Sequence, residues 1–451
     1  MSIKFYTSND IITLKNNFIS KFESPDPFSE NLIIVPNINV KKWLQLELTK
    51  EKNIISGLNI LYLESGLFYI LKKIFDIDER VIFLNDKDNL INLQLLIILI
   101  LLENEKENEL AIFKKYYKKN NIEDFNALWS LSQKITYYLR EYQYQKPDIL
   151  LKWEEDDLYF KNNRDIENGY KLIYRKLFIE KDNYLERLNE KSKENNIIYT
   201  TLSIFVKKNL NKINIDVKEK FGSDFKIYIF GLSLISHFHI ELLLKLSDYF
   251  EIEFYQLNYL NSEKNTYLDF YCNAYIKNKK LFDRIFNKKI DIIKNNKTDS
   301  KTNLLDSFKN CSLNNAKIEK IDQDETIQVI EAPTILREVE TVYNSIIYNL
   351  LKDERLKLTD IAIFVPDMNK YRYYIENVFA QYGIIPYNIN DFKLANESNF
   401  YRAINSFFEI VNSDFRKDRI LKLITNPLFM KKFSFNTSDI ENIIKLVDEL
   451  N

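Results

Sequence analysis

Glycine is scarce in this chain, which contains only six among its 451 residues. A nucleotide-binding P-loop and a dinucleotide fingerprint both need closely spaced glycines, because backbone N–H groups must approach phosphates closely. The six positions are Gly57, Gly66, Gly169, Gly222, Gly231 and Gly383. None begins a match to G-x4-G-K-(S/T) or to G-x-G-x-x-G. The sequence therefore argues against ATP binding by a P-loop and against a dinucleotide site.

Cysteine and histidine are equally rare, with two of each. Two cysteines make no disulfide framework, and the first residues lack the apolar segment of a signal peptide, so we expect a reduced, cytoplasmic protein. His237 and His239 have no nearby cysteine to complete a zinc site, and we interpret them as ordinary helix-start or surface residues. The acidic run at residues 154–157 is interpreted as a solvated helix end. We predict no catalytic residue and no bound metal.

Neither charge nor hydrophobicity is extreme. The formal net charge is -1, so any contact with nucleic acid must come from a local basic surface. The most apolar stretch, residues 90–102, is shorter than the roughly 20 residues that a membrane-spanning helix needs. We expect it to form a buried helix.

Two stretches combine apolar, β-branched runs with helical periodicity. Residues 327–332 and 361–367 read as strands that flank a helix at 335–351, and the order strand, helix, strand recurs at 226–232, 236–249 and 251–257. Parallel strand pairs with right-handed crossovers follow from this order. The sequence therefore predicts an α/β protein with two lobes.

The remaining elements suggest how these lobes are divided. Short strands at 3–6, 32–35 and 58–62 alternate with helices that start near Ser8–Asp10 and that cover 40–48 and 66–75. From 81 to 220 the pattern is almost entirely helical. We predict one α/β domain from residues 1–80 plus 221–325, interrupted by a helical insertion at 81–220. Within it, residues 258–325 are polar and weakly periodic, which predicts a long loop or linker.

The second predicted α/β domain covers residues 326–451. It includes a helix at about 368–382 and a further strand at 385–389, and it becomes helical from about residue 399. The sequence stops inside a helical pattern without an evident cap, which predicts a truncated chain.

Two segments interleave aromatic rings with cations. They are FKKYYKK at 113–119 and YYLREYQYQK at 137–146. Rings that stack on bases and cations that contact phosphates are typical of single-strand binding. However, the chain has 29 tyrosines, and both helices need partly buried faces. Strand binding and core packing therefore both remain open from composition alone.

Read in order, several stretches resemble the N-terminal part of the RecC family, the gamma chain of exodeoxyribonuclease V. The more specific motifs are WLQ at 43–45, KPD at 146–148 with Trp153 and Glu154, and REVE at 337–340. The matching stretches are FYTSN (5–9), IIVPNINVKKWLQLEL (33–48), LWSLSQKITYYLREYQYQKPDILLKWE (128–154), IYIFGLSLI (227–235), APTILREVETV (332–342) and IAIFVPDMNKY (361–371).

The resemblance implies a superfamily 1 helicase-like fold that has lost its ATPase site. The three predicted parts would be a 1A-like domain, a 1B-like helical insertion and the beginning of a 2A-like domain. It also implies a non-catalytic scaffold subunit that splits duplex DNA ends and guides one strand, with RecB-like and RecD-like partners in double-strand-break repair and recombination. No cofactor is expected in this chain, and ATP and Mg would belong to the partner subunits.

The same resemblance implies a set of residues lining a DNA channel, in which family members read a recombination hotspot. These positions are Pro36, Ile38, Lys42, Tyr62, Phe68, Tyr137, Tyr138, Arg140 and Lys146. Proline and isoleucine side chains cannot hydrogen-bond base edges, and Arg140 stands where an acid is expected. A sequence-tolerant channel is therefore the expectation. Two alternatives remain open: an active nuclease or helicase of the related AddB type, and a protein-interaction scaffold without direct DNA contact.

Overall fold

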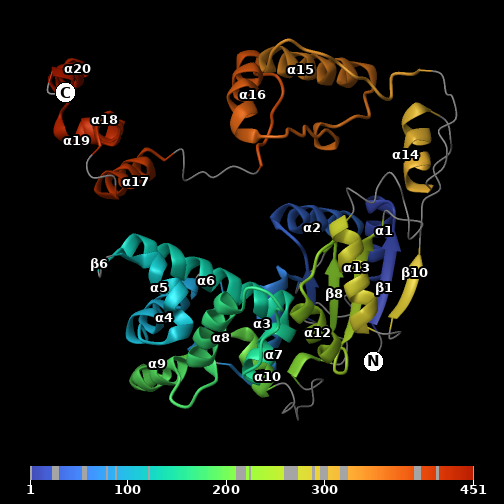
Figure 1. Cartoon of the computed structure of the whole chain (residues 1–451). Coiled ribbons are helices and arrows are strands. Elements are labelled where there is room, and N and C mark those ends of the chain that lie inside the picture. The colour runs from blue at the N-terminus through green and yellow to red at the C-terminus, as the bar shows by residue number, and fades with distance from the viewer. Residues whose placement is uncertain are drawn as a thin grey trace. The chain divides into compact units, whose positions relative to one another are not determined.

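The computed structural model divides the chain into two compact units, Met1–Ile327 and Gln328–Asn451 (Figure 1). Each unit is described by itself. The structure describes residues 3–22, 30–52, 58–77, 80–86, 89–119, 122–209, 220–222, 225–258, 273–286, 290–294, 303–314, 323–390, 398–412 and 416–449.

A six-stranded parallel sheet forms the centre of the first unit. Its strand order is β10-β1-β9-β8-β2-β3, and neighbouring strands pair in parallel. The bounds are β1 (Ile3–Ser8), β2 (Asn31–Ile34), β3 (Leu58–Leu61), β8 (Lys226–Phe230), β9 (Glu251–Leu257) and β10 (Ile290–Lys294). The strands predicted at 3–6, 32–35, 58–62, 226–232 and 251–257 are thus confirmed, and so is the α/β class.

Helices cover both faces of this sheet, as its near-continuous apolar strands require. On one face, α1 (Ile11–Lys21) and α2 (Ile38–Lys52) pack on Tyr228 and Phe230 of β8. On the other, α3 (Leu63–Phe75), α12 (His237–Leu246) and α13 (Asn273–Phe286) pack on the intervening residues Ile227 and Ile229. Alternate residues of β8 are therefore buried in two separate hydrophobic cores, one on each face of the sheet.

The prediction of a long loop at 258–325 is wrong for the described part of that segment. It contains α13, strand β10, which pairs with β1 at the edge of the sheet, and α14 (Leu304–Asn314). On α13, Phe282 and its apolar neighbours Leu281 and Ile285 lie among lysines and asparagines. These three apolar residues hardly change the average polarity of the segment. They nevertheless suffice to pack the helix against the sheet. Residues 259–272, 287–289, 295–302 and 315–322 lie outside the described residues.

The middle of the first unit is a helical body. Its helices are α4 (Leu90–Glu103), α5 (Ala111–Tyr117), α6 (Phe125–Gln145), α7 (Pro147–Glu154), α8 (Arg164–Phe178), α9 (Tyr184–Ser192) and α10 (Leu202–Asn209). Two short pairings interrupt them: β4 (Val81–Phe83) with β7 (Ile198–Thr200), and β5 (Lys118–Lys119) with β6 (Ile122–Glu123).

Helix α4 is the most apolar element of the body. Leu93, Ile97 and Ile100 are buried in its core, whereas Ile91 and Leu95 are exposed on the opposite side. The expected buried helix is therefore buried on one side only. Within the described residues, no helix combines the length and the apolar character that crossing a membrane requires.

The described part of the second unit is built from helices. They are α15 (Ile335–Lys352), α16 (Met368–Tyr382), α17 (Asn399–Asn412), α18 (Lys417–Ile424), α19 (Pro427–Phe433) and α20 (Thr437–Glu449). α15 and α16 enclose a core around Val339, Tyr343 and Phe379. The helices predicted at 335–351 and 368–382 and the helical region from about 399 are confirmed.

The strands predicted at 327–332, 361–367 and 385–389 do not form. These described segments run without strand pairing, and Val329 and Phe364 are 96% and 93% exposed. A strand is stabilised by backbone hydrogen bonds to a neighbour and by burial of its apolar face, and an isolated pair is marginal in water. The apolar, β-branched pattern alone therefore does not produce the predicted βαβ unit.

Candidate nucleic-acid interface

Ligands of open parallel α/β sheets bind outside the carboxyl ends of the strands. In this sheet, the turn between β1 and α1 occupies the position where a phosphate-binding loop precedes its helix. Asp10 caps α1 there, because its carboxylate accepts hydrogen bonds from the backbone N and the Oγ1 of Thr13, both at 2.7 Å. A carboxylate from the chain itself thus satisfies one N–H group of the helix N-terminus and places a negative charge where a phosphate would otherwise be favoured.

Four of the proposed channel residues lie where β2 and β3 end. The backbone N of Val35 donates to the carbonyl of Leu61 at 3.0 Å, which brings Pro36 and Tyr62 to the same edge of the sheet. Asn37 caps α2 by accepting from the backbone N–H groups of Asn39 and Val40. Pro36, Ile38, Lys42 and Tyr62 are all exposed, and Lys42 forms no ion pair with any described residue.

Helix α6 carries three more of the proposed residues, and Lys146 follows at its end. Tyr137 and Tyr138 are exposed side by side, with ring centroids 5.5 Å apart. Lys146 is exposed and lies between α6 and α7. The side chains of Tyr137, Tyr138 and Lys146 are therefore accessible to a ligand.

Arg140 and Phe68 are placed differently. Arg140 donates from Nε to the carbonyl of Asn85 at 2.9 Å and from Nη2 to Glu64 Oε1 at 3.0 Å. Its guanidinium also lies over the Tyr144 ring. Phe68 packs against Phe83, with ring centroids 4.6 Å apart, at the margin of the sheet core. Both side chains are engaged by the protein.

The Glu64–Arg140 ion pair joins the two groups of accessible residues. Glu64 lies in the first turn of α3, two residues after Tyr62. Arg140 lies on α6 about one turn after Tyr137. The ion pair therefore fixes α6 against the carboxyl edge of the sheet.

A buried polar network around Asn85 supports this junction, and sequence reasoning did not find it. Asn85 Nδ2 donates to the Tyr144 hydroxyl at 2.9 Å, and its Oδ1 accepts from the backbone N of Leu202 at 3.1 Å. The His239 ring lies 4.8 Å from Tyr144, and its Nδ1 lies 2.7 Å from Ser236 Oγ. Burial, aided by Arg140, lowers the pKa of His239 to about 4. The hydrogen-bond partners of Asn85 are 55 or more residues away in the chain, so no local sequence motif indicates them.

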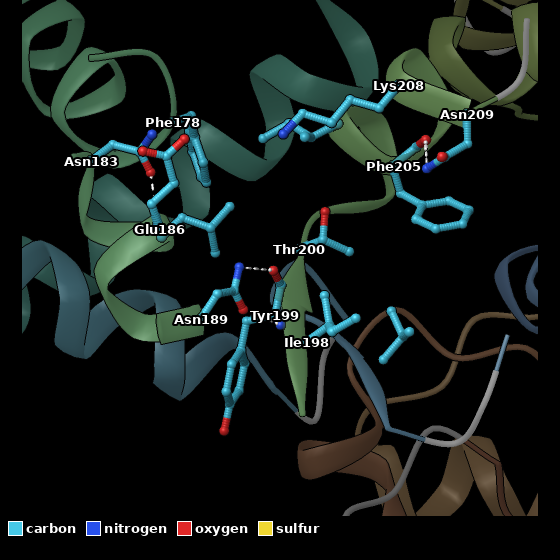
Figure 2. Close-up of a pocket in the computed structure, with 13 residues that line it drawn as sticks. Phe178, Asn183, Glu186, Asn189, Ile198, Tyr199, Thr200, Phe205, Lys208 and Asn209 are labelled. Carbon is cyan, nitrogen blue, oxygen red and sulfur yellow. Dashed lines mark hydrogen bonds between the residues drawn. The ribbon is translucent and has the colours of Figure 1, made fainter. Parts of the chain in front are cut away.

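Figure 2 shows one hollow of the helical body, of about 280 Å³, between α8, α9, β7 and α10. Asn189 exchanges two hydrogen bonds with the backbone of Tyr199, and Asn183 caps α9 through the backbone N of Glu186. Asn209 donates to the carbonyl of Phe205. These amides serve the local backbone, which is a structural use. In the part of the chain that the structure describes, no group of three or more His, Cys, Asp or Glu side chains is arranged to hold a metal ion.

Comparison with known proteins relates this architecture to one family. The family described as "RecC, N-terminal domain" matches residues 3–308. The RecBCD enzyme subunit RecC of Buchnera aphidicola subsp. Baizongia pistaciae is 19% identical over 481 aligned residues, which cover 94% of this chain and 41% of that protein. The RecBCD enzyme subunit RecC of Haemophilus influenzae is 20% identical, with coverages of 96% and 45%.

A shorter similarity reaches a second kind of protein. One subunit of the ATP-dependent helicase/deoxyribonuclease of Anoxybacillus flavithermus is 30% identical over 107 residues, which cover 24% of this chain and 9% of that protein. The chain spans less than half the length of the two RecC relatives above. Since the family match covers well over half of the chain, the protein belongs to the RecC family.

Proposed function

We propose that this chain is a DNA-binding, non-motor scaffold subunit of a RecBCD-type helicase and nuclease that acts in double-strand-break repair and recombination. Family membership supports this role, and the RecC relatives are named as RecBCD enzyme subunits. The proposed partners are duplex and single-stranded DNA ends and RecB-like and RecD-like subunits in a cytoplasmic complex. The proposed fold is an inactivated superfamily 1 helicase, with 1A-like, 1B-like and 2A-like parts.

One observation carries the proposal: the carboxyl edge of the sheet offers rings and cations instead of a phosphate loop. Asp10 already occupies the N-terminus of α1, whereas Lys42, Tyr62 and Tyr137 are accessible nearby or on the α6 helix joined to this edge. Such a surface suits the backbone and bases of a strand better than a nucleoside triphosphate. ATP and Mg are therefore assigned to the partner subunits.

The chemistry of each side chain suggests which part of a DNA strand it would contact. Lys42 and Lys146 would contact phosphates, and Tyr62, Tyr137 and Tyr138 would stack on bases. Pro36 and Ile38 have no side-chain donor or acceptor for a base edge. The channel is thus proposed to guide a strand with little dependence on its sequence, and scanning for a hotspot would need residues other than these.

Salt-dependent binding to a forked DNA tests this assignment. We expect the double variant Lys42→Gln, Lys146→Gln to bind less tightly. The negative slope of log affinity against log salt should become shallower by about 1 to 2, because each lysine neutralises about one phosphate. Fluorescence anisotropy at several salt concentrations measures both quantities. The matched control is Lys72→Gln, an exposed lysine in the last turn of α3, away from the strand ends. Equal slopes for all three proteins would contradict the assignment.

The alternative roles predict different outcomes. An active enzyme of the helicase/deoxyribonuclease type would hydrolyse ATP or cut DNA as an isolated chain. A protein-interaction scaffold would leave the fork unbound while still assembling with a motor subunit. Either result would replace the DNA-binding proposal.

A further inference from the structure

Four of the nine residues that line a second hollow of the helical body are aromatic. The hollow measures about 380 Å³ and lies where α6, α7 and the start of α8 meet. Tyr142 of α6, Trp153 of α7 and Tyr170 of α8 form its wall, and Phe160 of the loop between α7 and α8 stands at its mouth. Such a volume lies within the range of about 300 to 1,000 Å³ that is typical of small-molecule pockets.

The rings hold one another in a defined arrangement. Tyr142 meets Trp153 edge to face at 5.7 Å, and Trp153 lies nearly parallel to Tyr170 at 6.5 Å between ring centroids. Trp153 is only 1% exposed, so its position is fixed by the core. Burial raises the pKa of the Tyr142 and Tyr170 hydroxyls, which keeps both phenols neutral. The ring-bearing part of the wall is thus rigid and uncharged, and the Glu167 carboxylate lines the hollow beside it.

A buried carboxylate holds the mouth of the hollow in place. Glu167 Oε1 accepts from Trp153 Nε1 at 2.9 Å and from the backbone N of Tyr159 at 2.6 Å. Its Oε2 accepts from the backbone N of Phe160 at 2.9 Å. These bonds hold the loop backbone at Tyr159 and Phe160. Lys161 and Asn162 follow on the rim, where both are exposed and Lys161 forms no ion pair with a described residue.

The hollow continues the row of tyrosines on α6. Tyr138 lies 6.4 Å from Tyr142 and 6.3 Å from Tyr170, and its other neighbour is the exposed Tyr137. A row of rings therefore leads from the accessible side of α6 to the aromatic wall. A strand that follows this row would reach the hollow without leaving an aromatic surface.

We propose that the hollow binds a single unstacked nucleobase of a DNA strand, with its plane against the Phe160 ring and its phosphate near Lys161. The base would also contact Tyr142 and Tyr170, whose rings stand at 74° to each other. This subsite rests on the DNA-binding role proposed above. A flat base can stack on an aromatic ring that is held in place. Because every base has such a flat face, the stacking does not depend on the base sequence. The cation and the amide at the rim favour a nucleotide over a proline-rich peptide, which would use a ring-lined groove without a phosphate contact.

The variant Phe160→Ala tests the subsite with the 451-residue chain and a forked DNA that carries 2-aminopurine in its single-stranded arm. Bound to the unmodified chain, the probe should lose fluorescence as it stacks on the rings. We expect Phe160→Ala to restore much of that fluorescence and to weaken fork binding about ten-fold, which is within the range for losing one stacked base. Phe160 is 41% exposed, so its loss should leave the fold intact.

The matched control is Phe125→Ala. Phe125 is an aromatic residue at the start of α6, is 66% exposed and does not line the hollow. Probe fluorescence and affinity should stay at the unmodified values. Equal effects of the two variants would overturn the subsite.

The outcomes also separate this inference from the function on which it rests. If the unmodified chain does not bind the fork, the DNA-binding role itself fails. If the fork binds and depends on Lys42 and Lys146 but not on Phe160, only the subsite is overturned. If a proline-rich peptide binds in a Phe160-dependent manner while the probe is unaffected, the hollow is a peptide site and the inference is wrong.

Discussion

Arg140 shows how a charged residue in a basic, aromatic stretch can be used inside the fold. The sequence places it among tyrosines and lysines, which suggests contact with phosphates. In the structure its guanidinium is committed to Glu64 and to the carbonyl of Asn85, and its side chain is only 13% exposed. The neighbouring Tyr137 stays accessible because it lies on the exposed side of the same helix. At this scale, what a side chain does depends on partners that are distant in the chain.

At the scale of single residues, His239 makes the stability of the fold depend on pH. Its pKa is lowered to about 4 in the folded chain, against about 6.5 when unfolded, mainly because it is buried. Between these values the unfolded chain binds more protons. The stabilisation is therefore fully present above about pH 6.5 and is lost as the pH falls towards 4, by about 3 kcal/mol in total.

The variant His239→Gln should remove most of that loss. Denaturant unfolding at several pH values between about 4 and 8 measures it. His237→Gln, a change on the same helix next to an exposed Glu241, is the control and should retain the dependence of the unmodified chain. An unaltered pH profile in His239→Gln would contradict the assignment.

Secondary-structure elements differ in how much the sequence reveals about them. β2, β8 and β9 were predictable because their apolar runs are buried on both faces, which is the pattern of a central parallel strand. The same kind of run at 361–367 does not form a strand, since pairing depends on a neighbour that periodicity does not report. Conversely, α13 attaches to the sheet through a few apolar side chains in a polar segment. The proposed channel positions Tyr137 and Tyr138 on α6 come from the family resemblance, and the structure shows that both are exposed. The Asn85 network joins segments that are too far apart in the chain for a local motif to reveal it.

Helix α13 allows a direct test of this correction. Phe282 is 4% exposed and meets Phe5 and Phe254 edge to face, at 5.7 and 5.9 Å between ring centroids. We expect Phe282→Ala to lower the free energy of unfolding by about 3 to 5 kcal/mol, the usual cost of emptying a buried phenylalanine site. Phe308→Ala, on α14, is the control because that ring is half exposed, and it should cost far less. Chemical denaturation measures both. A similarly small effect of the two variants would restore the linker interpretation.

The whole molecule consists of two units with different spectroscopic reporters. The three tryptophans, Trp43, Trp129 and Trp153, all belong to the first unit. Tryptophan fluorescence therefore follows the unfolding of the sheet and the helical body, whereas far-ultraviolet circular dichroism follows helices of both units. Hydrogen exchange read by mass spectrometry locates protection in the second unit. These probes make the stability of each unit separately measurable.

The stability of the second unit can be used to test whether the apolar segments around Val329 and Phe364 pair as strands. Val329 and Phe364 are almost fully exposed, so the double variant Val329→Ser, Phe364→Ser should change the stability of this unit by less than about 0.5 kcal/mol. Val339→Ser, in the buried core between α15 and α16, should instead lower it by well over ~1 kcal/mol, because that change leaves a cavity and buries a hydroxyl. Exchange protection of α15 measures both. If the double variant were as damaging as Val339→Ser, these segments would be buried and paired, and the parallel strands predicted from the sequence would exist in this unit.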